Sequence, residues 1–156
     1  LAMAAECTEQ MEPPTHIFLQ AGGGGLAGAC AALFRDVWGD APVITVVEPE
    51  AAPALYGSVA AGEFVAAQGP VSDMGRLDCK EPTWMALRGM APDAHPALTL
   101  TEAQGQAGAD LAAAQGLETT ASGAAGLSGL LAARAAGLAV ASDAAVLVIL
   151  SEGPAE

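Results

Sequence analysis

Basic side chains are scarce in this sequence. Among its 156 residues, five Lys and Arg face eighteen Asp and Glu, which gives a formal net charge of −13. Such a charge repels nucleic acid and anionic membrane surfaces, so we expect neither as a partner. Long apolar runs are missing as well. The best candidate, GLAVASDAAVLVIL from Gly137, contains Ser142 and Asp143 and falls short of the roughly 18 residues of a spanning helix.

Cysteine is rare too. Cys7, Cys30 and Cys79 are odd in number, widely spaced and without a CxxC pair, which argues against a disulfide framework and against a metal site of the zinc type. The N-terminal residues show no basic stretch followed by an apolar run, so nothing indicates secretion. We therefore expect a protein of a reducing compartment, with a cytoplasmic location.

The length, with 53% hydrophobic residues, suits one domain, and we expect one over residues 1–156. Residues 1–10 already resemble the middle of a helix, and the first residue is Leu1, not Met. We therefore expect this domain to be a partial one, taken from a longer protein.

Strands and helices alternate along the chain. Strands are expected at 16–19, 43–47, 97–100 and 145–150, the last one buried, and helices at 2–11, 26–38, within 51–63, 83–90, from 101 to about 116 and at 123–136. Thr101 and Gln104 form a capping box, and Ser122 is expected to cap the last helix. This alternation predicts an α/β fold with parallel pairing. A long passage at 68–82 lacks such a pattern, and long ordered loops tend to carry function.

The stretch THIFLQAGGGGLAG, residues 15–28, places four glycines between a strand and a helix. A loop of this kind presents backbone N–H groups and a helix N-terminus to an anion, usually a phosphate. Gly23, Gly25 and Gly28 satisfy GxGxxG, and Glu48 ends the next strand twenty residues later, where it could hold a ribose hydroxyl. From the pattern alone, an NAD-binding Rossmann-type module therefore remains open.

Five segments taken in order carry a resemblance to a known family. They are HIFLQAGGGGLAG, VVEPE, VSDMGRLDCKEP, TTASGAAGLSGLL and VLVILSEGP. Together they resemble the C-terminal part of pyridoxal-phosphate (PLP) enzymes of the tryptophan-synthase-like fold, and more narrowly the diaminopropionate ammonia-lyases. The resemblance implies a three-layer, parallel-sheet domain from a cytoplasmic, homodimeric lyase of amino-acid catabolism. Such an enzyme would convert the small amino acid 2,3-diaminopropionate to pyruvate and ammonia. Threonine or serine dehydratase is the alternative within the same fold.

The resemblance also assigns roles to residues. The phosphate of PLP is expected on Gly22, Gly23, Gly24 and Gly25. Ser151 is expected at the pyridine nitrogen, with Glu152 as the alternative if the alignment slips by one. The substrate pocket is expected to include one or more of Asp78, Cys79 and Glu81.

The family also uses a Schiff-base lysine, and this resemblance places it upstream of the glycine loop. The only lysine of this chain, Lys80, lies downstream of the loop and is expected to be an exposed surface charge. We therefore expect no catalytic residue in these 156 residues, and no activity from the chain alone.

Overall fold

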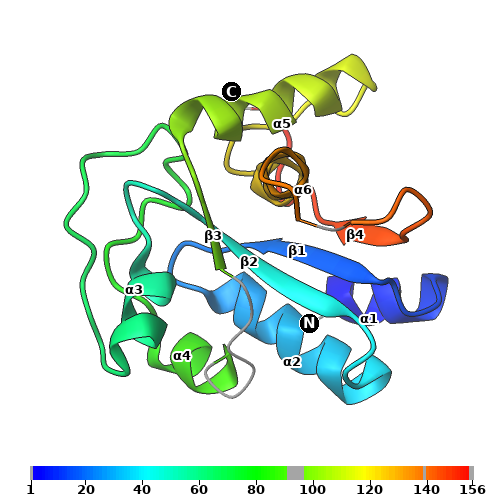
Figure 1. Cartoon of the computed structure of the whole chain (residues 1–156), viewed down its shortest axis with the longest axis horizontal. Helices are drawn as coiled ribbons and strands as arrows, with labels where there is room; N and C mark the ends of the chain where they lie inside the picture. The colour runs from blue at the N-terminus through cyan, green and yellow to red at the C-terminus, as the bar shows by residue number, and fades with distance from the viewer. Residues whose placement is uncertain (1, 91–96, 139, 155–156) are drawn as a thin grey trace.

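One parallel sheet in the strand order β3-β2-β1-β4 forms the centre of the protein. Its strands are β1 (His16–Gln20), β2 (Val43–Pro49), β3 (Ala97–Leu100) and β4 (Val146–Val148). The computed structural model describes residues 2–90, 97–138 and 140–154 (Figure 1). Because the paired strands all run in the same direction, their carboxyl ends lie at the same edge of the sheet.

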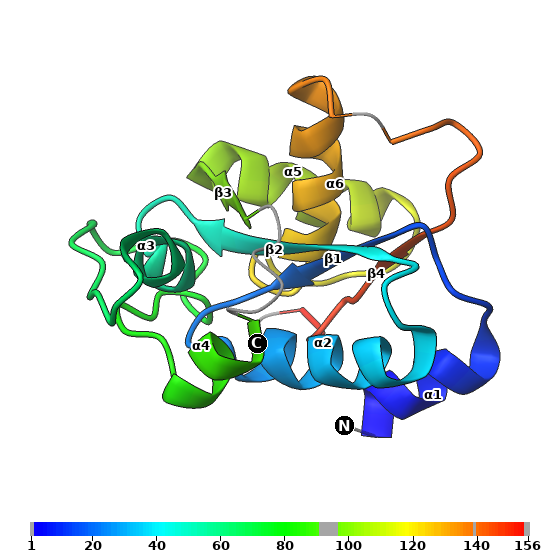
Figure 2. The same ribbon diagram turned by 60° about the horizontal axis from the view of Figure 1, so that its bottom comes forward.

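Helices cover both faces of this sheet. The described helices are α1 (Ala2–Gln10), α2 (Gly25–Trp38), α3 (Ala54–Ala61), α4 (Trp84–Met90), α5 (Glu102–Ala114) and α6 (Ala125–Ala135). Helices α5 and α6 lie on one face, and α1, α2 and α4 lie on the other (Figures 1 and 2). The predicted three-layer α/β architecture is therefore confirmed.

The alternation of side chains along β1 creates two separate cores. Ile17 and Leu19 are buried in a cluster with residues of α1 and α2, whereas Phe18 is buried in a second cluster with residues of α6. Successive side chains of a strand point to opposite faces of the sheet, so Gln20 shares the α6 side with Phe18. A polar side chain at the end of β1 is thereby directed toward the start of α6.

Two of the local predictions need correction. The capping box of Thr101 and Gln104 is confirmed at the start of α5, but Ser122 does not cap α6. Its Oγ instead accepts the N–H of Arg76, at 3.2 Å, and Ala124 is the N-cap residue. The last strand is also shorter than predicted and only half-buried, because β4 lies at the edge of the described sheet.

Among the helices of residues 2–90, 97–138 and 140–154, none is both long enough and apolar enough to cross a bilayer.

Candidate functional site

The glycine loop lies at the carboxyl edge of the sheet and lines a cavity of about 290 Å³. Strand β1 leads into the loop and α2 follows it, as the strand–loop–helix pattern predicts. The cavity is lined by residues 20–26, Arg76, Leu77, Ser151 and Glu152. The structure therefore brings the predicted phosphate loop and Ser151 together, although they are about 130 residues apart in sequence.

The glycine loop presents a group of unused hydrogen-bond donors. Within the described residues, no backbone or side-chain acceptor contacts the N–H groups of the glycines at 22–25. The N–H groups in the first turn of a helix have no acceptor within the helix, and the helix dipole makes this end favourable for an anion. The loop thus fits a phosphate group, which can accept several such bonds at once.

Three of the four glycines differ in what a side chain would meet at their positions. Gly24 has a φ of +87°, and a Cβ atom there would lie 2.5 Å from the Cβ of Ala86. A Cβ on Gly22 would lie 3.0 Å from Cys79 Sγ, so the 76–79 segment packs directly behind the loop. A Cβ on Gly25, in contrast, meets no protein atom within 4 Å. Packing within the chain therefore does not explain Gly25, whereas a ligand close to the backbone would.

Ser151 follows β4 and contacts the end of β1. Its Oγ accepts a hydrogen bond from Gln20 Nε2, at 3.0 Å, and its backbone N–H donates to Gly123 O, at 3.3 Å. The side chain of Gln20 is 1% exposed, while Ser151 is exposed at the cavity. Sequence reasoning missed Gln20, because nothing in the strand pattern distinguishes a buried amide from any other polar strand end.

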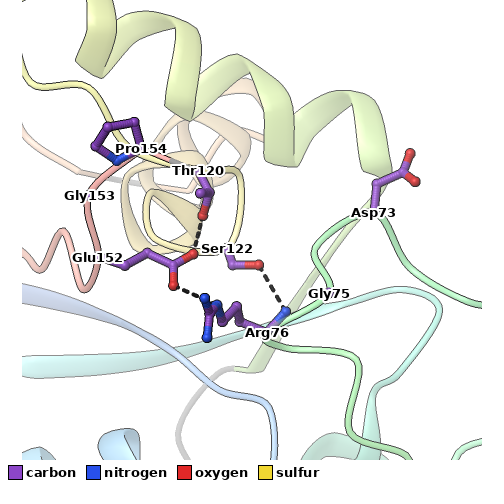
Figure 3. Close-up of a pocket in the computed structure, with 8 residues that line it drawn as sticks. All are labelled: Asp73, Gly75, Arg76, Thr120, Ser122, Glu152, Gly153 and Pro154. Carbon is purple, nitrogen blue, oxygen red and sulfur yellow. Dashed lines mark hydrogen bonds and ion pairs between the residues drawn. The ribbon is translucent and has the colours of Figure 1, made fainter. Parts of the chain in front are cut away.

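The side chain of Glu152 points toward Arg76 and Thr120 (Figure 3). Its carboxylate forms an ion pair with Arg76 Nε, at 3.0 Å, and accepts a hydrogen bond from Thr120 Oγ1. Its backbone carbonyl accepts a hydrogen bond from Thr119 Oγ1, at 2.7 Å. Arg76 and Glu152 also line a second cavity, of about 930 Å³. Neither Arg76 nor the two threonines were predicted as site residues, since their contacts join segments far apart in sequence.

The three predicted pocket residues lie behind or beside the glycine loop. Cys79 packs against Gly22, and the backbone carbonyl of Glu81, a residue with an exposed side chain, lies 3.9 Å from the Cβ position of Gly23. Asp78 pairs with Lys80, whose hydrogen bond holds the pKa of that carboxyl below its usual range. The residues of this segment that line the 290 Å³ cavity are Arg76 and Leu77.

The prediction of an exposed Lys80 is wrong. Its Nζ donates to Ala51 O at 3.0 Å, to Pro70 O at 2.6 Å and to Asp78 Oδ1 at 2.5 Å. Three donors on one ammonium can bind several carbonyls, so the 68–82 loop folds around this side chain and half-buries it. Lys80 therefore joins parts of the long loop to the end of β2.

Glu48 does not face the cavity as a ribose ligand would. Its side chain is 1% exposed, and its two carboxylate oxygens accept the N–H groups of Leu55 and Tyr56, both at 2.8 Å. These donors belong to the first turn of α3, so the carboxylate caps that helix. The acidic residue of the apparent dinucleotide motif thus has a structural role, and the NAD interpretation loses its support.

Comparisons with known proteins agree with this geometry. The sequence pattern of the family described as "Pyridoxal-phosphate dependent enzyme" matches residues 2–152. Diaminopropionate ammonia-lyase of Escherichia coli strain K12 is 36% identical over 98 residues, which cover 57% of this chain and 25% of that relative. The chain therefore aligns with about a quarter of the length of this curated relative.

Solved structures extend the similarity over nearly the whole chain. Diaminopropionate ammonia lyase from Escherichia coli, in complex with D-serine, is 28% identical with a TM-score of 0.81 and covers 97% of this chain and 42% of that one. The processed form of threonine deaminase isoform 2 from Solanum lycopersicum has a TM-score of 0.88 at 17% identity, covering 99% of this chain and 44% of that one. Because its identity is only 17%, the similarity to threonine deaminase shows a shared fold and nothing more.

Proposed function

Because the chain belongs to the pyridoxal-phosphate dependent enzymes, we propose that it forms the phosphate-binding and ring-nitrogen side of the active site of a lyase for 2,3-diaminopropionate. The observation that carries this proposal is the row of N–H groups at 22–25, which have no acceptor among the described residues and which line a cavity. The 36% identity to diaminopropionate ammonia-lyase supports the substrate. The products would be pyruvate and ammonia.

In this proposal the chain's own residues bind and orient the cofactor. The glycine loop holds the phosphate, and Ser151 faces the pyridine nitrogen across the same cavity. Ser151 is preferred over Glu152 because both carboxylate oxygens of Glu152 already have partners, Arg76 and Thr120. When bound, PLP withdraws electrons from the α-carbon of an amino acid, and a neutral hydroxyl at the ring nitrogen moderates this pull in a way that suits β-elimination.

The substrate pocket remains a separate part of the proposal. Asp78, Cys79 and Glu81 belong to the segment that packs behind the glycine loop, and Arg76 and Leu77 of that segment reach the cavity. We propose that this segment positions the loop and borders the bound amino acid. We further propose that residues 1–156 are one partial domain of a longer cytoplasmic enzyme that acts as a homodimer.

The phosphate contact is tested by Gly25→Ala. The probe is 4′-deoxypyridoxine 5′-phosphate, which carries the phosphate and the pyridine ring but no aldehyde that could react with Lys80. We expect its affinity, measured by titration calorimetry, to fall by about tenfold or more because the methyl group would obstruct the anion, equivalent to roughly 1.4 kcal/mol. Gly57→Ala in α3 is the matched control, since its Cβ also meets no protein atom within 4 Å and Gly57 does not line this cavity. Equal affinities for the two variants would contradict the proposal.

The 156-residue chain alone should not release pyruvate from 2,3-diaminopropionate. Its only lysine is held by Ala51 O, Pro70 O and Asp78, and it does not line the cavity of the glycine loop. A coupled pyruvate assay with added PLP checks this expectation. Turnover that disappears in Lys80→Ala would show that Lys80 can serve as the Schiff-base lysine.

A further inference from the structure

Arg76 is anchored at two points, one on its backbone and one on its side chain (Figure 3). Its backbone N–H donates to Ser122 Oγ, at 3.2 Å, and its Nε lies 3.0 Å from a carboxylate oxygen of Glu152. The other oxygen of Glu152 accepts from Thr120 Oγ1, so the partner of the ion pair is held as well. These contacts restrict where the guanidinium group lies but do not enclose it, because the side chain of Arg76 is 79% exposed.

The two terminal nitrogens of Arg76 are available to a ligand. Within residues 2–90, 97–138 and 140–154, no acceptor forms a hydrogen bond with Nη1 or Nη2. The N–H groups of these nitrogens form a planar fork that matches the two oxygens of a carboxylate. Since Glu152 pairs with Nε, the fork can bind a second carboxylate while the ion pair stays in place.

Arg76 and Glu152 line both cavities of this region. The smaller cavity, of about 290 Å³, contains the glycine loop, and the larger one measures about 930 Å³. Because the two cavities share these lining residues, a ligand that fills the first and extends into the second lies next to Arg76. Among the described residues that line the two cavities, Arg76 is the one basic side chain, whereas Asp73 and Glu152 are acidic.

A cofactor joined to an amino acid brings two anionic groups, the phosphate and the carboxylate, into such a site. In the proposed function the N–H groups at 22–25 bind the phosphate, so the carboxylate needs a donor of its own. A carboxylate that leaves water is unfavourable unless an opposite charge and hydrogen bonds replace its hydration. The guanidinium group of Arg76 supplies both.

We propose that Arg76 binds the carboxylate of the amino acid that reacts at this site, and so selects amino acids over amines. This inference rests on the proposed function, because it takes the cavity of the glycine loop to be the cofactor site. It deepens that function by assigning the recognition of the substrate's acid group to a residue of this chain.

The test compares two probes that differ only in the carboxylate. N-(5′-phosphopyridoxyl)-L-alanine joins the cofactor ring to an amino acid through a reduced C–N bond, and N-(5′-phosphopyridoxyl)ethylamine lacks the carboxylate. Neither has an aldehyde that could react with Lys80. In titration calorimetry of the 156-residue chain, Arg76→Gln should weaken binding of the alanine conjugate by about tenfold or more, and binding of the ethylamine conjugate by less than about twofold. Arg88→Gln is the matched control and should bind both like the wild type, since Arg88 is exposed at the end of α4 and lines neither cavity.

The comparison of the probes separates carboxylate binding from a structural role or a contact to the phosphate. An equal effect of Arg76→Gln on the two conjugates, or no effect on either, would overturn the inference while binding of the ethylamine conjugate to the wild type still supported the proposed function. Failure of the wild-type chain to bind the ethylamine conjugate would overturn the proposed function and the inference with it.

Arg76→Lys is a second variant, for use also if Arg76→Gln does not fold. Lysine keeps the positive charge beside Glu152 but lacks the planar fork of N–H groups. Its preference for the alanine conjugate should therefore fall below that of the wild type without being lost. A preference equal to that of the wild type, or none at all, would count against the inference.

Discussion

Gly24→Ala should destabilise the protein by about 3 kcal/mol, because it combines two separate penalties. An alanine at a φ of +87° costs about 1–2 kcal/mol, and overpacking a filled space costs typically 1–3 kcal/mol. The new Cβ would lie 2.5 Å from Ala86 Cβ and 2.7 Å from Leu55 Cδ1. Ala86 is buried at the base of the loop and has no flexible end that could move aside. Urea unfolding of the variant measures the loss.

Two other glycines separate the two penalties. Gly116 has a φ of +78° with no protein atom near its Cβ position, so Gly116→Ala should show only the backbone cost, about 1 kcal/mol. Gly25→Ala has neither penalty, so it should unfold at the same urea concentration as the wild type or at a slightly higher one. A Gly24→Ala variant no less stable than Gly116→Ala would contradict the packing of α3 and α4 against the loop.

Glu48 should make the stability depend on pH in a direction opposite to that of most carboxylates. Burial raises the pKa of Glu48 from 4.5 to about 7, although the N–H bonds from α3 act in the other direction. The folded state then keeps a proton that the unfolded state loses, so the contribution to stability is full below about pH 4.5 and is lost as the pH rises through about 7. The shift corresponds to about 3 kcal/mol over this range.

The measurement compares unfolding free energies of the wild type and Glu48→Gln at about pH 4 and about pH 8. Glutamine is similar in size to glutamate and is neutral at both pH values. The unfolding free energy of the variant, relative to that of the wild type, should therefore increase by about 3 kcal/mol from about pH 4 to about pH 8. Glu50→Gln changes an exposed carboxylate two residues away and serves as the control. A pH-independent difference for Glu48→Gln would show that the pKa of Glu48 is the same in the folded and unfolded states, which would contradict the effect of burial.

Local patterns in the sequence were sufficient to predict the main elements of the fold. The signals for strands, helices and caps each depend on residues that are neighbours in the sequence. The α/β order and the capping box at Thr101 could therefore be predicted. The glycine loop could also be placed, because a strand, four glycines and a helix are contiguous. The resemblance to PLP enzymes then gave the family, which the comparisons confirm.

Contacts between distant segments could not be predicted in the same way. Gln20 forms hydrogen bonds to groups 103 to 131 residues away in the sequence. Arg76 forms a hydrogen bond to Ser122 and an ion pair with Glu152, and both partners lie far from it in the sequence. Ser122 was expected to cap a helix because serine favours that position, but the folded chain places the N–H of Arg76 against it. Lys80 was expected on the surface for a similar reason, since the carbonyls of Ala51 and Pro70 that bind it are local neighbours only after folding.

The most direct test of the central claim is an amide NMR titration of the ¹⁵N-labelled 156-residue chain. The chain is titrated with 4′-deoxypyridoxine 5′-phosphate and, in parallel, with the same ring lacking the phosphate. If the glycine loop binds the cofactor's phosphate, the N–H resonances of the glycines at 22–25 will move downfield with the phosphate compound and stay in place with the other. Equal shifts with both compounds, or shifts confined to amides outside the loop, would contradict this assignment.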